Sequence, residues 1–139
     1  MSRGYNKHQD RLAAIAELGR ALARRARSRC ELCEESGVRL DPCEVTPLPE
    51  EPEHDRAVML CERCARGVDG GPLDALEWRF LESAAWSTVP AGQVTAVRAL
   101  RRAADDGVHW AISAVDALYL DPEIEAWVDG ASPGAPQDT

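Results

Sequence analysis

The sequence is poor in histidine, phenylalanine and tyrosine, and it contains no long apolar run. Because no run of about 18 apolar residues occurs, we expect no membrane-spanning helix. A Gly-rich phosphate loop, a Gly-x-Ser-x-Gly elbow and a Ser-x-x-Lys motif are all missing, which excludes the nucleotide and serine-nucleophile sites that those motifs build. The aromatic residues that do occur include four tryptophans, which are expected to anchor a core.

Acidic residues are scarce only at the start of the chain. Residues 1–29 carry eight basic and two acidic side chains, whereas 30–69 and 70–139 each carry four basic and eleven acidic ones, for a net charge of −8. Because an acidic body repels phosphate, only the N-terminal segment offers a footprint for nucleic acid. Arg20, Arg24 and Arg25 interrupt any apolar core of a secretory signal, so we expect a cytoplasmic protein.

Four of the five cysteines form two pairs, each with two intervening residues. The pairs are Cys30/Cys33 and Cys61/Cys64, and 27 residues separate them. A two-residue spacer lets the backbone turn so that both sulfur atoms face the same ion. The spacing therefore predicts one Zn²⁺ per chain, bound by four thiolates.

Four sulfur ligands indicate a structural metal, because catalytic zinc keeps one position open for water or substrate. A segment of about 35 residues buries too little apolar surface to fold unaided, so metal binding is expected to stabilise it. The alternatives are two disulfides or reduced cysteines scattered through a core. The spacing and the expected reducing compartment favour the metal over both.

The N-terminal segment, residues 1–29, is predicted to form an amphipathic basic helix. Its apolar residues recur at helical spacing in an Ala-rich background, and Asn6 or Asp10 is a candidate N-cap. Arg20, Arg24 and Arg27 follow at steps of four and three residues, which predicts a basic stripe. This stripe is either a contact surface for an anionic partner or a solvated helix face.

Residues 30–70 are predicted to form a zinc-ribbon-like or treble-clef-like module. A turn at Ser36-Gly37 precedes a short strand at Val38-Arg39-Leu40, and residues 46–55, with three prolines, read as a loop. Ala57-Val58-Met59-Leu60 reads as the returning strand, which ends on Cys61 and is followed by a helical turn.

Residues 71–130 are predicted to form a helical unit packed against the zinc module, and 131–139 a disordered tail. A first helix is expected from Pro72, with Leu73, Leu76, Phe80 and Ala84 on one face. Three more are expected from Pro90 to Gly107, from Val108 to Leu120, and from Asp121-Pro122 to Gly130. The predicted fold is mainly α with a small zinc-bearing hairpin.

HNH nucleases share the cysteine framework and the hairpin, so their catalytic positions can be compared with this chain. Where that fold places two histidines, an asparagine and a third histidine, this chain has Cys43 and Glu44, about Arg56, and Ala65. Phosphodiester hydrolysis would therefore lack its general base and its catalytic ion. A degenerate nuclease or a phosphonate-linked protein remains as an alternative.

The other candidates for function are His54, Cys43 and the tryptophans. His54 is read as a solvated loop residue rather than a catalytic group. Cys43 is read as a small buried hydrophobe, with an alternative ligand or a redox-sensitive thiol as its other readings. Core packing is expected for the tryptophans, with base stacking or a pocket lining as the alternative; they are Trp78, Trp86, Trp110 and Trp127.

Several segments together resemble the PhnA-like proteins, which are named for an alkylphosphonate-utilisation operon. The resemblance covers roughly residues 28–130 and is carried by Arg29-Cys30-Glu31-Leu32-Cys33, Leu60-Cys61-Glu62-Arg63-Cys64, Trp78-Arg79-Phe80-Leu81, Ala85-Trp86-Ser87-Thr88-Val89-Pro90 with Gln93-Val94, and Asp116-Ala117-Leu118-Tyr119-Leu120-Asp121. It implies zinc ligation by Cys30, Cys33, Cys61 and Cys64. A β-rich C-terminal domain common in that family has no counterpart in these 139 residues.

We therefore expect a zinc-structured binding or adaptor protein rather than an enzyme, with a protein partner that the sequence does not identify. Nucleic-acid binding through the N-terminal arginines is the main alternative.

Overall fold

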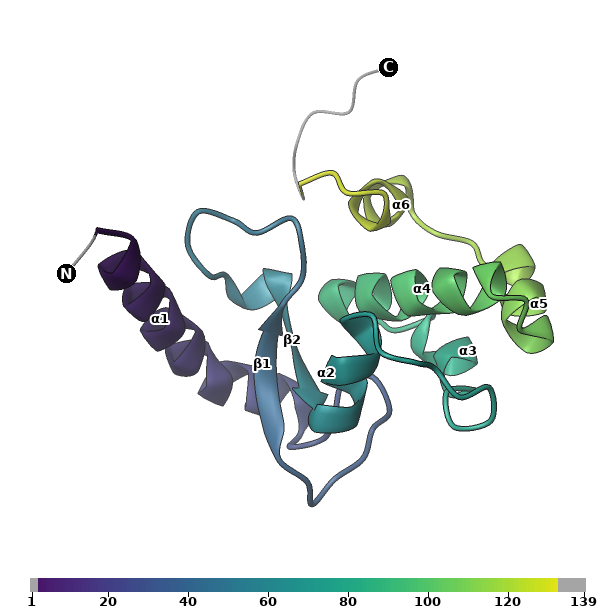
Figure 1. Ribbon diagram of the computed structural model, residues 1–139, viewed down its shortest axis with the longest axis horizontal. Coiled ribbons are helices and arrows are strands. Elements are labelled where there is room, and N and C mark those ends of the chain that lie inside the picture. The colour runs from purple at the N-terminus through teal and green to yellow at the C-terminus, as the bar shows by residue number, and fades with distance from the viewer. Residues whose placement is uncertain (1–2, 133–139) are drawn as a thin grey trace.

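The computed structural model describes residues 3–132, with side chains from Asn6 onward. It is mainly helical with one two-stranded antiparallel sheet, so the predicted fold class is confirmed (Figure 1). The elements are α1 (Arg3–Ala26), β1 (Leu40–Glu44), the 3₁₀ helix η1 (His54–Arg56), β2 (Ala57–Cys61), α2 (Glu62–Val68), α3 (Leu81–Ala84), α4 (Pro90–Asp105), α5 (His109–Ala117) and α6 (Pro122–Val128).

Helix α1 differs from its prediction at both ends. It already includes Asn6 and Asp10, so neither residue is its N-cap. It ends at Ala26 because Arg27 and Ser28 adopt left-handed backbone conformations, with φ of 57° and 58°. The helix is therefore shorter than the predicted segment 1–29, and Arg27 lies beyond it.

The hairpin pairs β1 with β2 in an antiparallel register that places Pro42 opposite Met59. The predicted first strand at Val38-Arg39-Leu40 is wrong, because β1 begins only at Leu40 and extends to Glu44. Pro42 argues against a strand in the sequence, since it has no N–H to donate. In a sheet of two strands, however, each strand has a free edge, and proline is tolerated there. The returning strand is confirmed.

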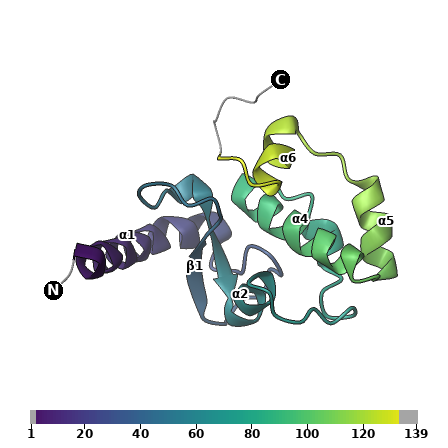
Figure 2. The same cartoon turned by 45° about the horizontal axis from the view of Figure 1, so that its top comes forward.

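Strand β2 is buried along its whole length because helices cover both of its faces. On one face, Ala57 and Met59 pack with Leu22 of α1. On the other, Val58 and Leu60 belong to the larger core that includes α4. Figures 1 and 2 show α1 on one side of the hairpin and α4 on the other. Strand β2 thus joins the N-terminal helix to the rest of the fold.

The helix predicted from Pro72 is absent, and only α3 forms in this region. The Asp74 carboxylate accepts the backbone N–H groups of Leu76 and Glu77 at 2.9 and 3.0 Å, which replaces helical hydrogen bonds by an Asx-type turn. Tight turns then continue to Leu81, and Leu76 is 86% exposed instead of lying on a buried face.

Helix α4 is the centre of the C-terminal part of the fold. It begins at Pro90, as predicted, because proline suits the first helical turn. Its buried residues contact α3, α5 and α6 as well as the hairpin. The two following helices are also confirmed, although α5 ends at Ala117 instead of Leu120. Of the predicted disordered tail, residues 133–139 lie outside the described residues.

Core packing of the tryptophans is confirmed for two of the four. Trp78 and Trp127 are 3% and 4% exposed. Trp110 is half-buried and donates its indole N–H to the carbonyl oxygen of Ala75 at 2.8 Å. For Trp86 the prediction is wrong, because that side chain is 53% exposed beside the turn into α4.

Candidate metal centre

The sulfur atoms of Cys30, Cys33, Cys61 and Cys64 all lie within 4.8 Å of one another. Cys33 Sγ and Cys61 Sγ are 3.8 Å apart, far beyond the length of a disulfide bond. In a tetrahedral zinc site with Zn–S distances of about 2.3 Å, neighbouring sulfur atoms are about 3.8 Å apart. The four thiols therefore fit a single metal ion of this size and geometry.

The two cysteine pairs come from different kinds of local structure. Cys30 precedes a tight turn in which the Glu34 N–H donates to the Cys30 carbonyl at 2.9 Å, and Glu34 has a φ of 66°. Cys61 ends β2 and stands directly before α2, whose first turns include Cys64. A turn and a strand-to-helix junction thus face each other, and three of the four ligands are buried.

The thiols cannot all ionise together without a cation. The hydrogen bond from the Cys64 thiol and, to a smaller extent, backbone N–H groups of the site outweigh the opposing effect of burial and lower the pKa of Cys30 to about 4. The same bond to Cys30 raises the pKa of Cys64, and burial raises that of Cys33. The Cys30 thiolate is therefore favoured while Cys33 and Cys64 stay protonated, until a divalent metal ion binds the thiolates and offsets part of their negative charge.

Arg63 is the positive side chain beside this site. Burial lowers its pKa, but the hydrogen bond to Cys33 and the nearby thiols raise it, and the net shift is upward. Its guanidinium carbon lies 5.7 Å from the centre of the Phe80 ring, which holds the side chain over an aromatic face. Since Zn²⁺ with four thiolates carries a charge of −2, Arg63 is placed to offset part of that charge.

Glu31 fixes the first cysteine pair to the hairpin. Its carboxylate accepts hydrogen bonds from the Met59 N–H at 2.9 Å and from Nε and Nη2 of Arg25 at 2.9 and 2.7 Å. Arg25 also donates to the carbonyl oxygens of His54 and Ala57. The Glu31 side chain is 6% exposed and that of Arg25 is 18% exposed. The sequence analysis did not identify this pair, because nothing in the pattern distinguishes Arg25 from the exposed Arg24.

A second arginine of α1 makes a similar connection. Arg11 donates two hydrogen bonds to the Glu44 carboxylate, at 2.6 and 2.8 Å, and others to the carbonyl oxygens of Pro49 and Glu50. Two of the eight basic residues in the segment 1–29, Arg11 and Arg25, thus bind α1 to the hairpin and its loop.

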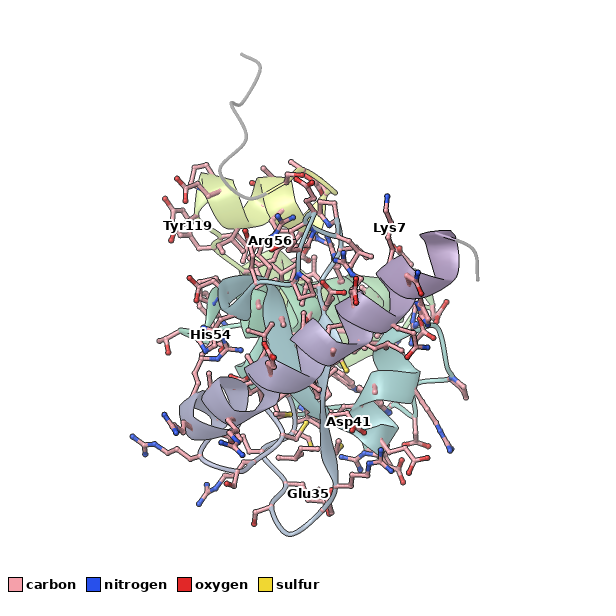
Figure 3. All side chains as sticks on the ribbon, turned by 90° about the vertical axis from the view of Figure 1, so that its left-hand side faces the viewer. Lys7, Glu35, Asp41, His54, Arg56 and Tyr119 are labelled. Carbon is pink, nitrogen blue, oxygen red and sulfur yellow. The ribbon has the colours of Figure 1, made fainter. Side chains whose placement is uncertain are left out.

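The predicted anion-contact residues remain on the surface. Arg20 and Arg24 are exposed on α1, and Arg27 is exposed just after it; Arg29, which was not among the predicted residues, is exposed as well. Among residues 6–132 these four make no ion pair or side-chain hydrogen bond. In Figure 3, side chains at the C-terminal end of α1 point their nitrogen tips away from the ribbon. Arg27 does not continue the helical stripe, because it lies beyond the end of α1.

The remaining candidates lie outside the cysteine cluster. The Cys43 thiol packs against the main core, and burial raises its pKa to about 11. His54 lies at the start of η1, where Nδ1 is 3.0 Å from a carboxylate oxygen of the exposed Asp55. The other positions compared with HNH nucleases are Glu44 on β1, Arg56 in η1 and Ala65 in α2; Glu44 and Ala65 line one cavity with Cys43, whereas Arg56 does not. Within the described residues, the four cysteines form the candidate metal cluster.

Comparisons of the chain with protein families, with curated proteins and with solved structures find no match. No helix in the described part of the chain is long and apolar enough to cross a membrane.

Proposed function

We propose that this chain is a zinc-stabilised binding protein of the PhnA-like type, in which the metal holds the fold and takes no part in catalysis. The observation that carries the proposal is the convergence of four thiols with the spacing of a tetrahedral site. Four thiolates fill the coordination sphere of zinc, so no position remains for water or substrate. Zinc is preferred over other metals because its ordinary structural sites use four sulfur ligands at this geometry.

The position of the cysteines in the core supports a structural role. Cys30, Cys61 and Cys64 are 1%, 3% and 0% exposed and belong to the same core cluster as residues of α4. Removing the metal would therefore leave several thiols, one of them ionised, buried in the main core without a compensating cation, which would destabilise the fold. The resemblance in sequence to PhnA-like proteins agrees with a zinc module followed by helices.

The test uses the zinc-loaded full chain as an immobilised bait, with a Cys61→Ser/Cys64→Ser variant as the metal-free control. We expect one zinc per wild-type chain and a partner retained only by the wild type. Zinc-independent retention would contradict the proposal, because binding would then not require the metal-stabilised fold. Turnover of a phosphodiester in a metal-supplemented assay would contradict its non-enzymatic part and favour the degenerate nuclease.

A second candidate function is nucleic-acid binding through Arg20, Arg24, Arg27 and Arg29. It is favoured by their exposure at one end of α1, without acidic partners among residues 6–132, in a chain that is otherwise acidic. Their charge is thus available to phosphate groups, and affinity for DNA or RNA would fall steeply with salt.

A matched pair of triple variants tests this candidate by gel retardation. Arg20, Arg24 and Arg27 are replaced by alanine in one variant. In the control, the exposed residues Arg39, Arg66 and Arg79 are replaced instead, so that both variants have a net charge of −11, three below the native −8. Loss of the retarded band only in the first variant supports the candidate, and equal binding by both variants refutes it.

A further inference from the structure

A cavity of about 500 Å³ lies where the hairpin, α2 and α4 meet; Leu60 and Ala65, which adjoin Cys61 and Cys64 in the chain, line it, but none of the four clustered cysteines does. Its size falls within the range of about 300 to 1,000 Å³ typical of sites for small molecules. Apolar side chains from all three elements form most of its wall, among them Val58, Leu60, Val68 and Ala99. Polar groups come chiefly from one face of α4, which contributes Thr95, Arg98 and Arg102.

The two arginines of this cavity bind only neutral acceptors. Arg98 donates to Thr46 Oγ1 and to the carbonyl oxygens of Trp127 and Val128, at 2.6 to 3.2 Å. Burial lowers the pKa of Arg98, as expected for a cation partly removed from water without a carboxylate partner.

Arg102 donates only to the carbonyl oxygens of Gly67 and Gly71, both at 2.7 Å. A guanidinium has five N–H donors, so Arg98 uses three of them and Arg102 two. Both side chains therefore keep positive charge and donors for another group.

Two acidic residues also line the cavity, and they differ in availability. The Glu44 carboxylate is already held by the two hydrogen bonds from Arg11. Asp69 is exposed at the C-terminal end of α2 and makes no ion pair within the described residues. The charges that remain available to a ligand are therefore the two positive charges of Arg98 and Arg102 and the negative charge of Asp69. Their sum is positive.

We propose that this cavity binds a small organic anion. The apolar part of the ligand contacts the half-buried Ala65 and Val68, above the buried side chains of β2, and its anionic oxygen atoms accept hydrogen bonds from Arg98 and Arg102. This site is independent of the proposed function, because it uses neither the metal nor the arginines of α1.

The first test compares 3-phenylpropionate with the neutral 3-phenylpropionamide, which has nearly the same shape. We expect saturable one-to-one binding of the acid by titration calorimetry, at least about tenfold tighter than binding of the amide. Backbone amide shifts of the zinc-loaded protein should change most at Val68, Thr95 and Ala99. Equal affinity for the two compounds, shifts centred elsewhere, or no saturable binding of the acid would overturn the proposal.

Three variants separate binding in the cavity from adsorption to the surface. Ala99→Leu fills the cavity and should abolish binding while zinc content and helicity are unchanged. Asp69→Asn removes the opposing charge at an exposed position, where folding is not at risk, and should tighten binding about threefold. The control is Arg101→Gln. Arg101 also lies on α4, but it pairs with Asp129 and does not line the cavity, so this variant should bind the acid as tightly as the wild type. Unchanged affinity in Asp69→Asn together with weakened binding in Arg101→Gln would refute the proposed location.

Discussion

The pair formed by Arg25 and Glu31 connects α1, the first cysteine pair and the hairpin, so replacing Arg25 by alanine should weaken all three connections. The change removes two hydrogen bonds to the Glu31 carboxylate and two more to the carbonyl oxygens of His54 and Ala57. It leaves Glu31, 6% exposed, with the Met59 N–H as its remaining partner.

The expected loss of stability follows from burial. Removing one partner of a buried ion pair costs about 3 to 5 kcal/mol, because the other charge is left uncompensated. Arg25 is 18% exposed, and the Met59 N–H still stabilises the carboxylate, so both facts reduce the loss. We expect Arg25→Ala to lower the free energy of unfolding by about 2 to 4 kcal/mol.

Urea unfolding of the zinc-loaded protein, followed by tryptophan fluorescence, measures this loss. The matched control is Arg24→Ala, which removes the same charge from the neighbouring exposed position and should change stability by less than about 0.5 kcal/mol. Adding Glu31→Gln to Arg25→Ala should recover part of the loss, since the buried charge is then gone. If Arg25→Ala were no more destabilising than Arg24→Ala, the role given to this pair would be wrong.

Four further predictions concern other parts of the chain. Gly19→Ala should raise the free energy of unfolding by about 0.5 to 1 kcal/mol, because a Cβ there meets nothing within 4 Å in α1. Gly67→Ala should lower it by about 1 to 3 kcal/mol, since the new Cβ would overlap the Trp78 ring; thermal denaturation of both variants decides the sign of each change. Arg63→Gln should weaken zinc affinity about tenfold in a chelator competition, and an unchanged affinity would exclude its role in offsetting the charge of the site. Alkylation of Cys43 in the zinc-loaded protein should be about a hundredfold slower at pH 8 than for an ordinary thiol, because its pKa is raised to about 11 and the thiolate fraction falls accordingly; an ordinary rate would contradict its burial.

Local sequence patterns predicted the elements whose formation depends on nearby residues. Pro90 and the apolar spacing after it predicted α4, and the apolar run before Cys61 predicted β2. The same reasoning failed after Pro72, because the Asp74 carboxylate takes backbone N–H groups that a helix would use. It also misplaced the first strand, which runs from Leu40 to Glu44 and includes Pro42; a proline is tolerated there because the sheet has only two strands.

The candidate site likewise has one part that the sequence predicted, the cysteines, and one that it did not, the partners of the arginines. Spacing alone identified the four cysteines, because each pair is positioned by local structure: a tight turn for Cys30 and Cys33, and the junction of β2 with α2 for Cys61 and Cys64. The partners of the arginines could not be predicted, because Arg11 and Glu44 are 33 residues apart and meet only once α1 lies on the hairpin. Among the arginines near the start of the chain, sequence could not tell Arg25, which is used in the fold, from Arg24, which is exposed.

The most direct test of a structural zinc site is the metal content of the purified chain, measured together with its circular dichroism before and after treatment with a strong chelator. We predict one zinc per chain, loss of cooperative thermal unfolding when the metal is removed, and recovery when Zn²⁺ is added back. Absence of bound metal, together with a spectrum and a melting temperature unaffected by the chelator, would contradict the account.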